Sequence, residues 1–485
     1  MGIRKSNIEL LTKIYVFIML AIFPLATSDN YFDILDIKWL FTVIPTCLFI
    51  LTAIVLKIVK KERLELYSPN NKILFVFAML LVTSVVVGIF FCTEPLISFW
   101  GITGRYLGLM VIVPLVLSTL IVSNHFEYSR IIYFGTIISS LIVFIFQILH
   151  EFKIDIFGMW DGMMKEEIPL FTSTIGNINF NATYNCMIIS IAIAIFVSRS
   201  DENSQTENVL SIAYIALAFA ASICLRSNGF FLGIAASLIA LYIYSIKNIE
   251  KLKGIAYTLL SFAIGSALVF VLTNLAKKSF KLKSLSSYAI DIKIIGLEIL
   301  VAVIIYLLSE RLNRTILIGI GIVALAIVIF TVFFGENPVL DYSKINDHSM
   351  HNRIYVWRKT LEYIKTFTPL QLLFGCGIND FQFGFVDFCG QEMQQLGYNT
   401  FIDAHSEYLQ AFASTGLIGF VGYFGMIITT LNHSIRNKSN GIIATSFIIA
   451  FMAQGLVYGP QITTTPILFI MLGIFWSRSF DVNEL

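Results

Sequence analysis

One histidine and one aspartate lie together where a polar segment of the sequence meets an apolar run. His405 stands in the sequence Ala-His-Ser-Glu-Tyr-Leu, directly before that run, and Asp403 precedes it by two residues. An imidazole can act as a general base near neutral pH, and a neighbouring carboxylate can orient it. His405 is therefore a candidate catalytic base with Asp403 as its partner. The alternative is a histidine that only satisfies a loop carbonyl.

Three arginines have the chemistry needed to bind an anionic substrate group. A guanidinium group carries permanent charge and a planar fork of donors, which lysine lacks. Arg353 lies in a polar segment, while Arg105 and Arg226 lie close to the expected outer ends of apolar runs. An arginine at the middle of a membrane costs about 2.5–3.5 kcal/mol on insertion scales, so both positions call for an explanation. Binding of an anionic substrate is one, and snorkelling to the membrane surface is the other.

The cysteines do not form a metal-binding pattern. Six are scattered along the chain without a CxxC pair or a histidine-rich neighbourhood, so we expect no metal site and no cofactor. Cys376 and Cys389 share a polar segment in which an oxidising compartment would allow a disulfide. Free buried thiols are the alternative for this pair.

The elements that must position these residues are membrane helices. Hydrophobic residues make up 57% of the 485 residues and charged residues 13%, and the mean hydropathy is +0.81. A soluble protein carries roughly a quarter charged residues. The basic residues sit in short clusters between apolar runs, which argues against nucleic-acid binding. A helix needs about 20 apolar residues to cross a bilayer, which predicts spans at 8–27, 38–58, 72–92, 106–123, 130–149, 183–198, 209–225, 229–246, 254–275, 291–308, 314–334, 408–431, 440–457 and 463–478.

We therefore predict an all-α, polytopic integral membrane protein with about 12–14 transmembrane helices. Residues 1–334 would hold about eleven spans, residues 335–404 one large and partly helical extracytoplasmic loop, and residues 405–485 about three further spans. Within the loop, apolar residues recur with a helical period and predict an amphipathic helix over 353–366.

Basic residues in short loops predict which helix ends face the cytoplasm. The clearest cytoplasmic loop is 57–63, with the sequence Lys-Ile-Val-Lys-Lys-Glu-Arg. Helix alternation then puts residues 4–5, 247–253, 311–314 and 436–438 inside and the segment 335–404 outside. One loop disagrees, because Lys277, Lys278, Lys281 and Lys283 come out external in this count.

Several motifs resemble those of bacterial O-antigen ligases and related polysaccharide polymerases. His405-Ser406, nine residues, Gly416, two residues and Gly419 are similar to the ligase pattern His-[Asn/Ser/Gln]-x9-Gly-x-x-[Gly/Thr/Tyr] in spacing and residue type. Three further stretches resemble the wider family and occur in its expected order, namely 100–108, 176–180, and 353–377 with its Arg-Ile-Tyr-Val-Trp start and Gly-Cys-Gly end.

The resemblance implies a metal-independent, inverting transfer of a glycan from an undecaprenyl-diphosphate carrier to an acceptor hydroxyl. The acceptor would be lipid A-core or another hydroxyl, at the periplasmic face of a bacterial inner membrane. On this interpretation His405 takes the acceptor's proton, and Arg353 binds the diphosphate with Arg105 and Arg226. Family members often have Ser-Arg-Gly where this chain has Ser227-Asn228-Gly229, so Arg226 stands two residues before the usual arginine.

Three other functions stay open at this point. A polysaccharide polymerase uses the same donor with a second lipid-linked glycan as acceptor, and a protein O-oligosaccharyltransferase uses a Ser or Thr side chain. A transporter of lipid-linked sugars would place ionisable residues deep in its spans. Glu298 is the main such residue here, whereas most polar residues gather outside the spans, which favours surface chemistry.

Overall fold

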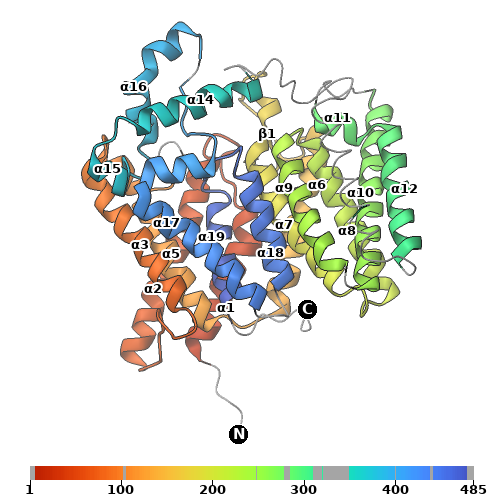
Figure 1. Ribbon diagram of the computed structural model, residues 1–485, viewed down its shortest axis with the longest axis horizontal. Coiled ribbons are helices and arrows are strands. Elements are labelled where there is room, and N and C mark those ends of the chain that lie inside the picture. Colours follow the sequence, from red (N-terminus) through yellow and green to blue (C-terminus); the bar gives the residue numbers. More distant parts are fainter. Residues whose placement is uncertain are drawn as a thin grey trace. The chain divides into compact units, whose positions relative to one another are not determined.

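The structure, a computed structural model, describes residues 6–101, 105–246, 248–277, 284–309, 319, 349–398, 400–436 and 441–477. This part of the chain is almost entirely helical (Figure 1). Its strands are the two-residue segments β1 (Phe171–Thr172) and β2 (Gly176–Asn177), which pair antiparallel. Ten described helices are long and apolar enough to cross a membrane. The prediction of an all-α polytopic membrane protein is therefore confirmed.

The chain forms two compact units. The first comprises residues 1–139, 347–440 and 455–485, and the second residues 140–346 and 441–454. The described helices of the first unit are α1 (Asn7–Phe17), η1 (Ile18–Ile22), η2 (Phe23–Leu25), α2 (Ile34–Val59), α3 (Lys72–Gly88), η3 (Ile89–Phe91), α4 (Pro95–Trp100), α5 (Leu109–His125), α14 (Ser349–Ile364), α15 (Pro369–Phe374), α16 (Phe381–Gln395), α17 (Glu407–Arg436) and α19 (Thr465–Trp476).

In the second unit, hydroxyl and amide side chains link the apolar helices. Ser446 on α18 hydrogen-bonds the Ser190 carbonyl on α7 at 2.9 Å, and Gln454 donates to Thr183 at 2.7 Å. Such small polar residues allow close helix packing within a membrane. The elements of this unit are α6 (Arg130–Glu151, beginning in the first unit), η4 (Ile168–Leu170), β1, β2, α7 (Ile178–Ser198), α8 (Gln205–Cys224), α9 (Asn228–Ser245), α10 (Ile249–Leu275), α11 (Leu285–Ala289), α12 (Ile292–Ser309) and α18 (Gly441–Gln454).

Helix α17 is broken at Gly416, where φ is 59° and ψ is −168°. This left-handed conformation suits glycine. A Cβ at this position would also lie 2.6 Å from the backbone nitrogen of Gly375. We call residues 407–415 the short limb and 417–436 the long limb. The sequence predicted one continuous span over 408–431, whereas the long limb alone, at about 1.5 Å per residue, has the length needed to cross a bilayer.

The long limb packs closely against α3 through glycines spaced three residues apart. A Cβ at Gly419 would lie 2.6 Å from the Ser84 hydroxyl, and one at Gly422 would lie 2.5 Å from the Leu81 nitrogen. Small residues at such spacing let two helix backbones approach each other in a membrane. Of the two motif glycines, Gly419 thus allows close helix packing, whereas Gly416 forms the helix break.

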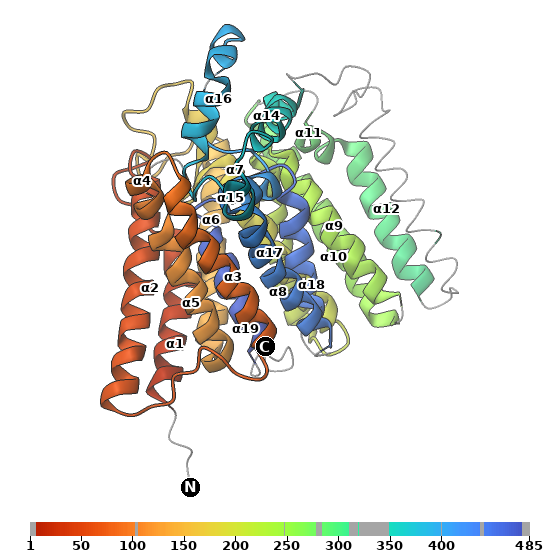
Figure 2. The same cartoon turned by 60° about the vertical axis from the view of Figure 1, so that its left-hand side comes forward.

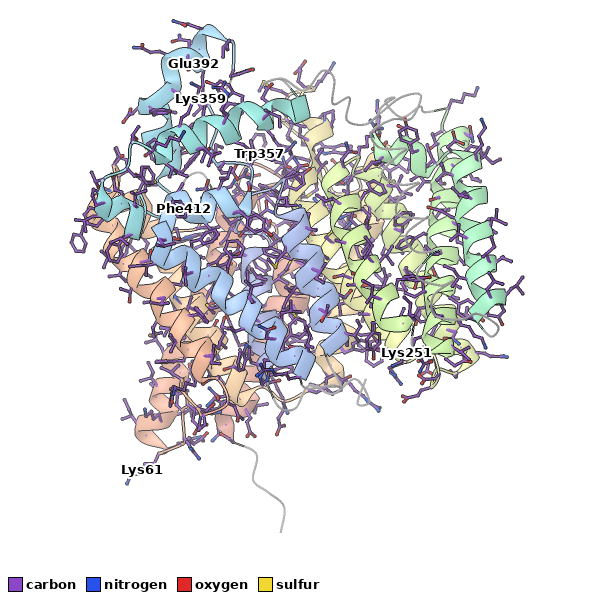
Figure 3. All side chains as sticks on the ribbon, in the orientation of Figure 1. Lys61, Lys251, Trp357, Lys359, Glu392 and Phe412 are labelled. Atoms are coloured by element: carbon purple, nitrogen blue, oxygen red, sulfur yellow. The ribbon has the colours of Figure 1, made fainter. Side chains whose placement is uncertain are left out.

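Helices α14, α15 and α16 form the described part of the predicted loop (Figure 2). They share a small apolar core that includes Tyr355, Phe381, Phe385 and Met393. Helix α14 coincides with the predicted amphipathic helix. Figure 3 shows Trp357 of α14 and Lys61 of the basic loop at opposite ends of the first unit.

Some of the predictions concern residues that the structure does not describe. These are the predicted span 314–334, the loop residues 335–348 and the basic residues at 4–5, 278–283, 311–314 and 437–440.

Candidate active site

His405 lies in the turn that precedes the short limb of α17, with a left-handed φ of 48°. Asp403 Oδ1 accepts hydrogen bonds from the His405 backbone nitrogen at 3.2 Å and from its Nδ1 at 2.9 Å. A proton held on Nδ1 leaves the lone pair of a neutral imidazole on Nε2. The side chain is 27% exposed. The turn therefore presents Nε2 as the atom that can act as a base.

The Asp403 carboxylate is completely buried and paired with Arg105. Its Oδ2 accepts hydrogen bonds from Arg105 Nε and Nη2, both at 2.8 Å. Burial alone would raise the pKa of Asp403, but the charges of Arg105 and His405 and their hydrogen bonds more than offset it. They hold the pKa well below its usual value. Asp403 is accordingly an anion that can stabilise a positive charge on His405.

A loop between α18 and α19, residues 455–460, encloses this cluster. The Gly455 carbonyl accepts a hydrogen bond from the Glu407 nitrogen at 2.8 Å. At Gly459 there is no room for a side chain, because a Cβ would collide with Asp403 Oδ2. The loop therefore covers Asp403 and fixes the start of the short limb.

The same loop positions Arg353 of α14. Arg353 Nε donates to the Val457 carbonyl at 2.9 Å, and its guanidinium carbon lies 4.8 Å from the centre of the Tyr458 ring. One turn further along α14, Trp357 Nε1 donates to the His405 carbonyl at 3.3 Å. Arg353 and His405 are thus positioned by the same helix and the same loop.

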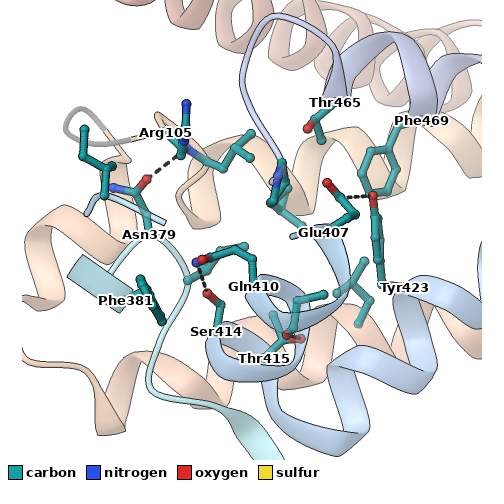
Figure 4. A pocket seen from close by; sticks show the side chains of 17 residues that line it. Arg105, Asn379, Phe381, Glu407, Gln410, Ser414, Thr415, Tyr423, Thr465 and Phe469 are labelled. Atoms are coloured by element: carbon teal, nitrogen blue, oxygen red, sulfur yellow. Dashed lines mark hydrogen bonds between the residues drawn. The ribbon is translucent and has the colours of Figure 1, made fainter. Parts of the chain in front are cut away.

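A cavity of about 70 Å³ lies next to the cluster (Figure 4), which is room for several water molecules. Its polar lining includes Arg105, Glu407, Gln410 and Thr465, and the rest is largely apolar. The Glu407 carboxylate is 3% exposed and accepts a hydrogen bond from Tyr423 Oη at 2.6 Å.

Loop 376–380 joins helices α14–α16 to the segment 93–107, which ends in the loop that carries Arg105. Asp380 accepts hydrogen bonds from the nitrogens of Thr93 at 2.7 Å and Glu94 at 2.9 Å. Burial raises the pKa of Asp380, although these two hydrogen bonds oppose the shift. The neighbouring Asn379 accepts a hydrogen bond from the Leu107 nitrogen at 3.4 Å.

Arg226 lies in the second unit. It has a left-handed φ of 54°, and its Nη2 forms an ion pair with Glu151 at the end of α6. The structure thus brings His405 and Arg105 into contact with Asp403 and places Arg353 of α14 against loop 455–460, which covers Asp403. Arg226 instead has a carboxylate partner within the second unit. Glu298 lies half-buried in α12 of that second unit.

Cys376 and Cys389 are both buried and unbridged. Each lies in the apolar core shared by helices α14–α16. The sequence left a disulfide and free buried thiols as alternatives for this pair, and the structure has free thiols. Among the described residues no group of three or more His, Cys, Asp or Glu side chains is arranged to hold a metal ion.

Sequence reasoning missed loop 455–460 as part of the site. The predicted span 440–457 placed its first residues inside a helix, whereas α18 ends at Gln454. Gly455, Gly459 and Pro460 are signals for a loop that could have identified it. The loop contacts Arg353 through Val457 and Tyr458 and meets Asp403 at Gly459. These contacts join residues about 50 to 100 positions apart in the chain, which no local pattern reveals.

The fold and this site define a multi-pass membrane protein with an Arg-Asp-His cluster beside the small helical subdomain α14–α16. A family model described as O-antigen ligase matches residues 291–424. The matched segment contains Arg353, Asp403, His405 and the Gly416 turn, and the match supports the resemblance to the O-antigen ligase family that the sequence motifs indicated.

One curated relative is an uncharacterized protein of Haemophilus influenzae. It is 25% identical over 224 residues, which cover 41% of this chain and 54% of the relative. The match therefore spans about half the length of that protein.

Proposed function

We propose that this protein is an O-antigen ligase that transfers a glycan from an undecaprenyl-diphosphate carrier to an acceptor hydroxyl, with lipid A-core as the first candidate acceptor. The observation that carries the proposal is the Arg105–Asp403–His405 chain, built on a buried carboxylate beside Arg353, in a segment that matches the family model. In the reaction the acceptor oxygen bonds to the anomeric carbon from the face opposite the diphosphate. As that bond forms, the bond between the anomeric carbon and the diphosphate oxygen breaks, and undecaprenyl diphosphate leaves with that bond's electron pair.

His405 Nε2 would take the proton of the acceptor hydroxyl, a role worth about 10²–10⁴-fold in rate. The Asp403 carboxylate, 2.9 Å from Nδ1, would stabilise the imidazolium that forms. His405 would return the proton to water, because its side chain is partly exposed. No step of this mechanism needs a metal ion, so a chelator should leave the activity unchanged.

The two arginines of the first unit would act differently. Arg105 turns Nε and Nη2 toward Asp403, so its role in the proposal is to keep that carboxylate ionised. Arg353 would bind the diphosphate, because its guanidinium plane is fixed by Val457 and Tyr458. Arg226 would bind the substrate only if its guanidinium group left Glu151 and paired with the diphosphate instead.

The direction of the site relative to the membrane follows from α2. The Tyr106 hydroxyl, adjacent to Arg105, hydrogen-bonds Asp36 near the start of this 26-residue helix. The basic loop 57–63 lies at its other end, roughly 40 Å away. Because basic loops stay in the cytoplasm, the site would face the periplasm of a bacterial inner membrane.

The test is to supply the purified protein with an undecaprenyl-diphosphate glycan and separate acceptors. Lipid A-core should be glycosylated, and His405→Ala should lower the rate by at least about 100-fold. The matched control is His433→Ala, because His433 stacks on Trp476 in the last turn of α17 and should tolerate the change. Normal product from a folded His405→Ala protein would overturn the proposed mechanism. Product only with a second lipid-linked glycan, or with a Ser/Thr peptide, would identify a polymerase or a protein glycosyltransferase instead.

A further inference from the structure

The short limb of α17 folds back on the long limb. Glu407 and Tyr423 are 16 residues apart, which would separate them by about 24 Å in a straight helix. Instead, the Tyr423 hydroxyl lies 2.6 Å from the Glu407 carboxylate. The break at Gly416 therefore makes a helical hairpin, with Glu407 and Tyr423 meeting at its open end.

Two further side-chain pairs between the limbs lie symmetrically about Gly416. The rings of Phe412 and Phe420 lie 5.9 Å apart, and those of Tyr408 and Phe424 stack at 4.9 Å with an interplanar angle of 3°. These aromatic contacts have no directional hydrogen bond. The Glu407–Tyr423 contact supplies one, and it lies at the end of the hairpin next to His405.

The surroundings of this hydrogen bond make it costly to break. Glu407 is 3% exposed and Tyr423 is 8% exposed. Each has its partner in the cavity wall shown in Figure 4. A buried polar group that loses its partner pays the full penalty of desolvation. The hydrogen bond therefore holds the hairpin closed more strongly than an exposed one would.

We propose that Glu407 and Tyr423 form a latch that closes the hairpin of α17 and keeps His405 at its working position. This inference rests on the proposed function, in which His405 is the base. The two residues are positioning residues, because they act through the hairpin and do not touch the reacting atoms.

The geometry explains how the latch would affect the reaction. The short limb is nine residues long, about 13 Å from the Gly416 turn to its start. His405 lies two residues beyond Glu407, at the end of this lever. A displacement of about 1 Å between a base and its substrate can lower a rate by about 100-fold. Opening the latch should therefore reduce kcat and leave substrate binding through Arg353 intact.

Two conservative substitutions separate the latch from a charge effect. Tyr423→Phe keeps the ring and removes the hydroxyl, so we expect kcat to fall about 10- to 100-fold with KM unchanged. Glu407→Gln keeps a carbonyl oxygen that can accept from Tyr423, so it should stay within about threefold of the wild type. Glu407→Leu should behave like Tyr423→Phe, and the double variant Glu407→Leu/Tyr423→Phe should be no worse than either single change.

The matched control is Tyr15→Phe. Tyr15 is also buried in the first unit, and its hydroxyl lies 3.0 Å from that of Thr46 and 3.2 Å from that of Ser118. This variant should lose stability without the selective loss of kcat. Unfolding temperatures measured for every variant separate a fall in kcat from a fall in the amount of folded protein.

Two results would overturn the latch. One is a Tyr423→Phe protein with normal kcat, and the other is a Glu407→Gln protein as impaired as Glu407→Leu, which would mean that the charge of Glu407 acts by itself. His405→Ala is measured in the same series. If that variant kept its activity, the proposed function would fail, whereas an inactive His405→Ala beside a fully active Tyr423→Phe would refute the latch alone.

Discussion

At the scale of single residues, the site is built around one buried carboxylate. Asp403 uses Oδ1 for the backbone and ring of His405 and Oδ2 for Arg105, so both oxygens have partners. Each partner donates and Asp403 only accepts, which fixes Nδ1 as the protonated nitrogen of a neutral His405. The sequence suggested Asp403 only as a partner of the nearby His405, whereas the structure makes Asp403 the centre of the cluster.

Replacing this carboxylate should change the pH dependence of stability. The pKa of Asp403 is lower in the folded protein than the value of about 3.9 in an unfolded chain, so ionised Asp403 stabilises the fold above that pH. The contribution should stay constant from pH 8 to about pH 5 and be lost as the pH falls below about 4.

Unfolding temperatures of the detergent-purified wild type and Asp403→Asn at several pH values would check this. The gap between the two proteins should be widest above about pH 5 and narrow in acid. Asp387→Asn is a suitable control, because Asp387 is exposed on α16. A gap that widened in acid would contradict the depressed pKa.

Arg353→Lys tests whether the guanidinium fork matters. Lysine keeps the charge but cannot donate in the same planar arrangement to Val457 and a diphosphate, so kcat/KM should fall by about 10-fold or more. Arg358→Lys is the matched control, because Arg358 pairs with Glu362 at 3.0 Å on the exposed side of the same helix. Equal activity of the two variants would reduce Arg353 to a general positive charge.

At the scale of elements, the Gly416 turn determines where His405 lies. The turn is packed between the end of α15 and α3, since Ser84 donates to the Thr415 carbonyl and Cys376 N donates to the Ala413 carbonyl at 2.9 Å. The sequence motif identified Gly416 and Gly419 by their spacing from His405. It did not predict the reversal, because the apolar run continues through Gly416 and hydropathy does not register a change of chain direction.

Gly416→Ala should therefore destabilise the protein beyond the cost of a left-handed alanine. The control is Gly397→Ala, which has a φ of 69° but no atom within 4 Å of the new Cβ. We expect Gly416→Ala to lower the free energy of unfolding by about 1–3 kcal/mol more than Gly397→Ala. If thermal unfolding showed equal losses of stability in the two variants, the backbone around Gly375 would be able to move away from the new Cβ at little cost.

At the scale of the whole molecule, composition and hydropathy predicted the fold class and most helix positions. Those properties are local, so one sequence reveals them. The pairing of Arg105 with Asp403, 298 residues apart, depends on how the helices assemble. Loop 455–460 was hidden for the same reason, because its role arises from contacts with α14 and with the turn before α17. The site residues were thus identified individually by type and motif, and their arrangement was not predictable.

The proposed orientation makes a direct prediction about labelling. In intact cells, a membrane-impermeant maleimide should react with a cysteine introduced at Gln394, which is exposed on α16, and should not react with one at Lys61. Lys61→Cys should react only after the membrane is opened. Labelling of Lys61→Cys from outside would invert the orientation and remove the periplasmic site.

The hairpin of α17 also limits how the motif can vary in length. Each residue added to the short limb would rotate its start by about 100° around the helix axis and lengthen it by about 1.5 Å. His405 would then turn away from Arg353 and from loop 455–460, even with every side chain of the cluster retained. The number of residues between Ser406 and Gly416, which is nine, therefore determines the direction in which His405 faces. A single insertion or deletion there should inactivate the protein as completely as loss of the histidine itself.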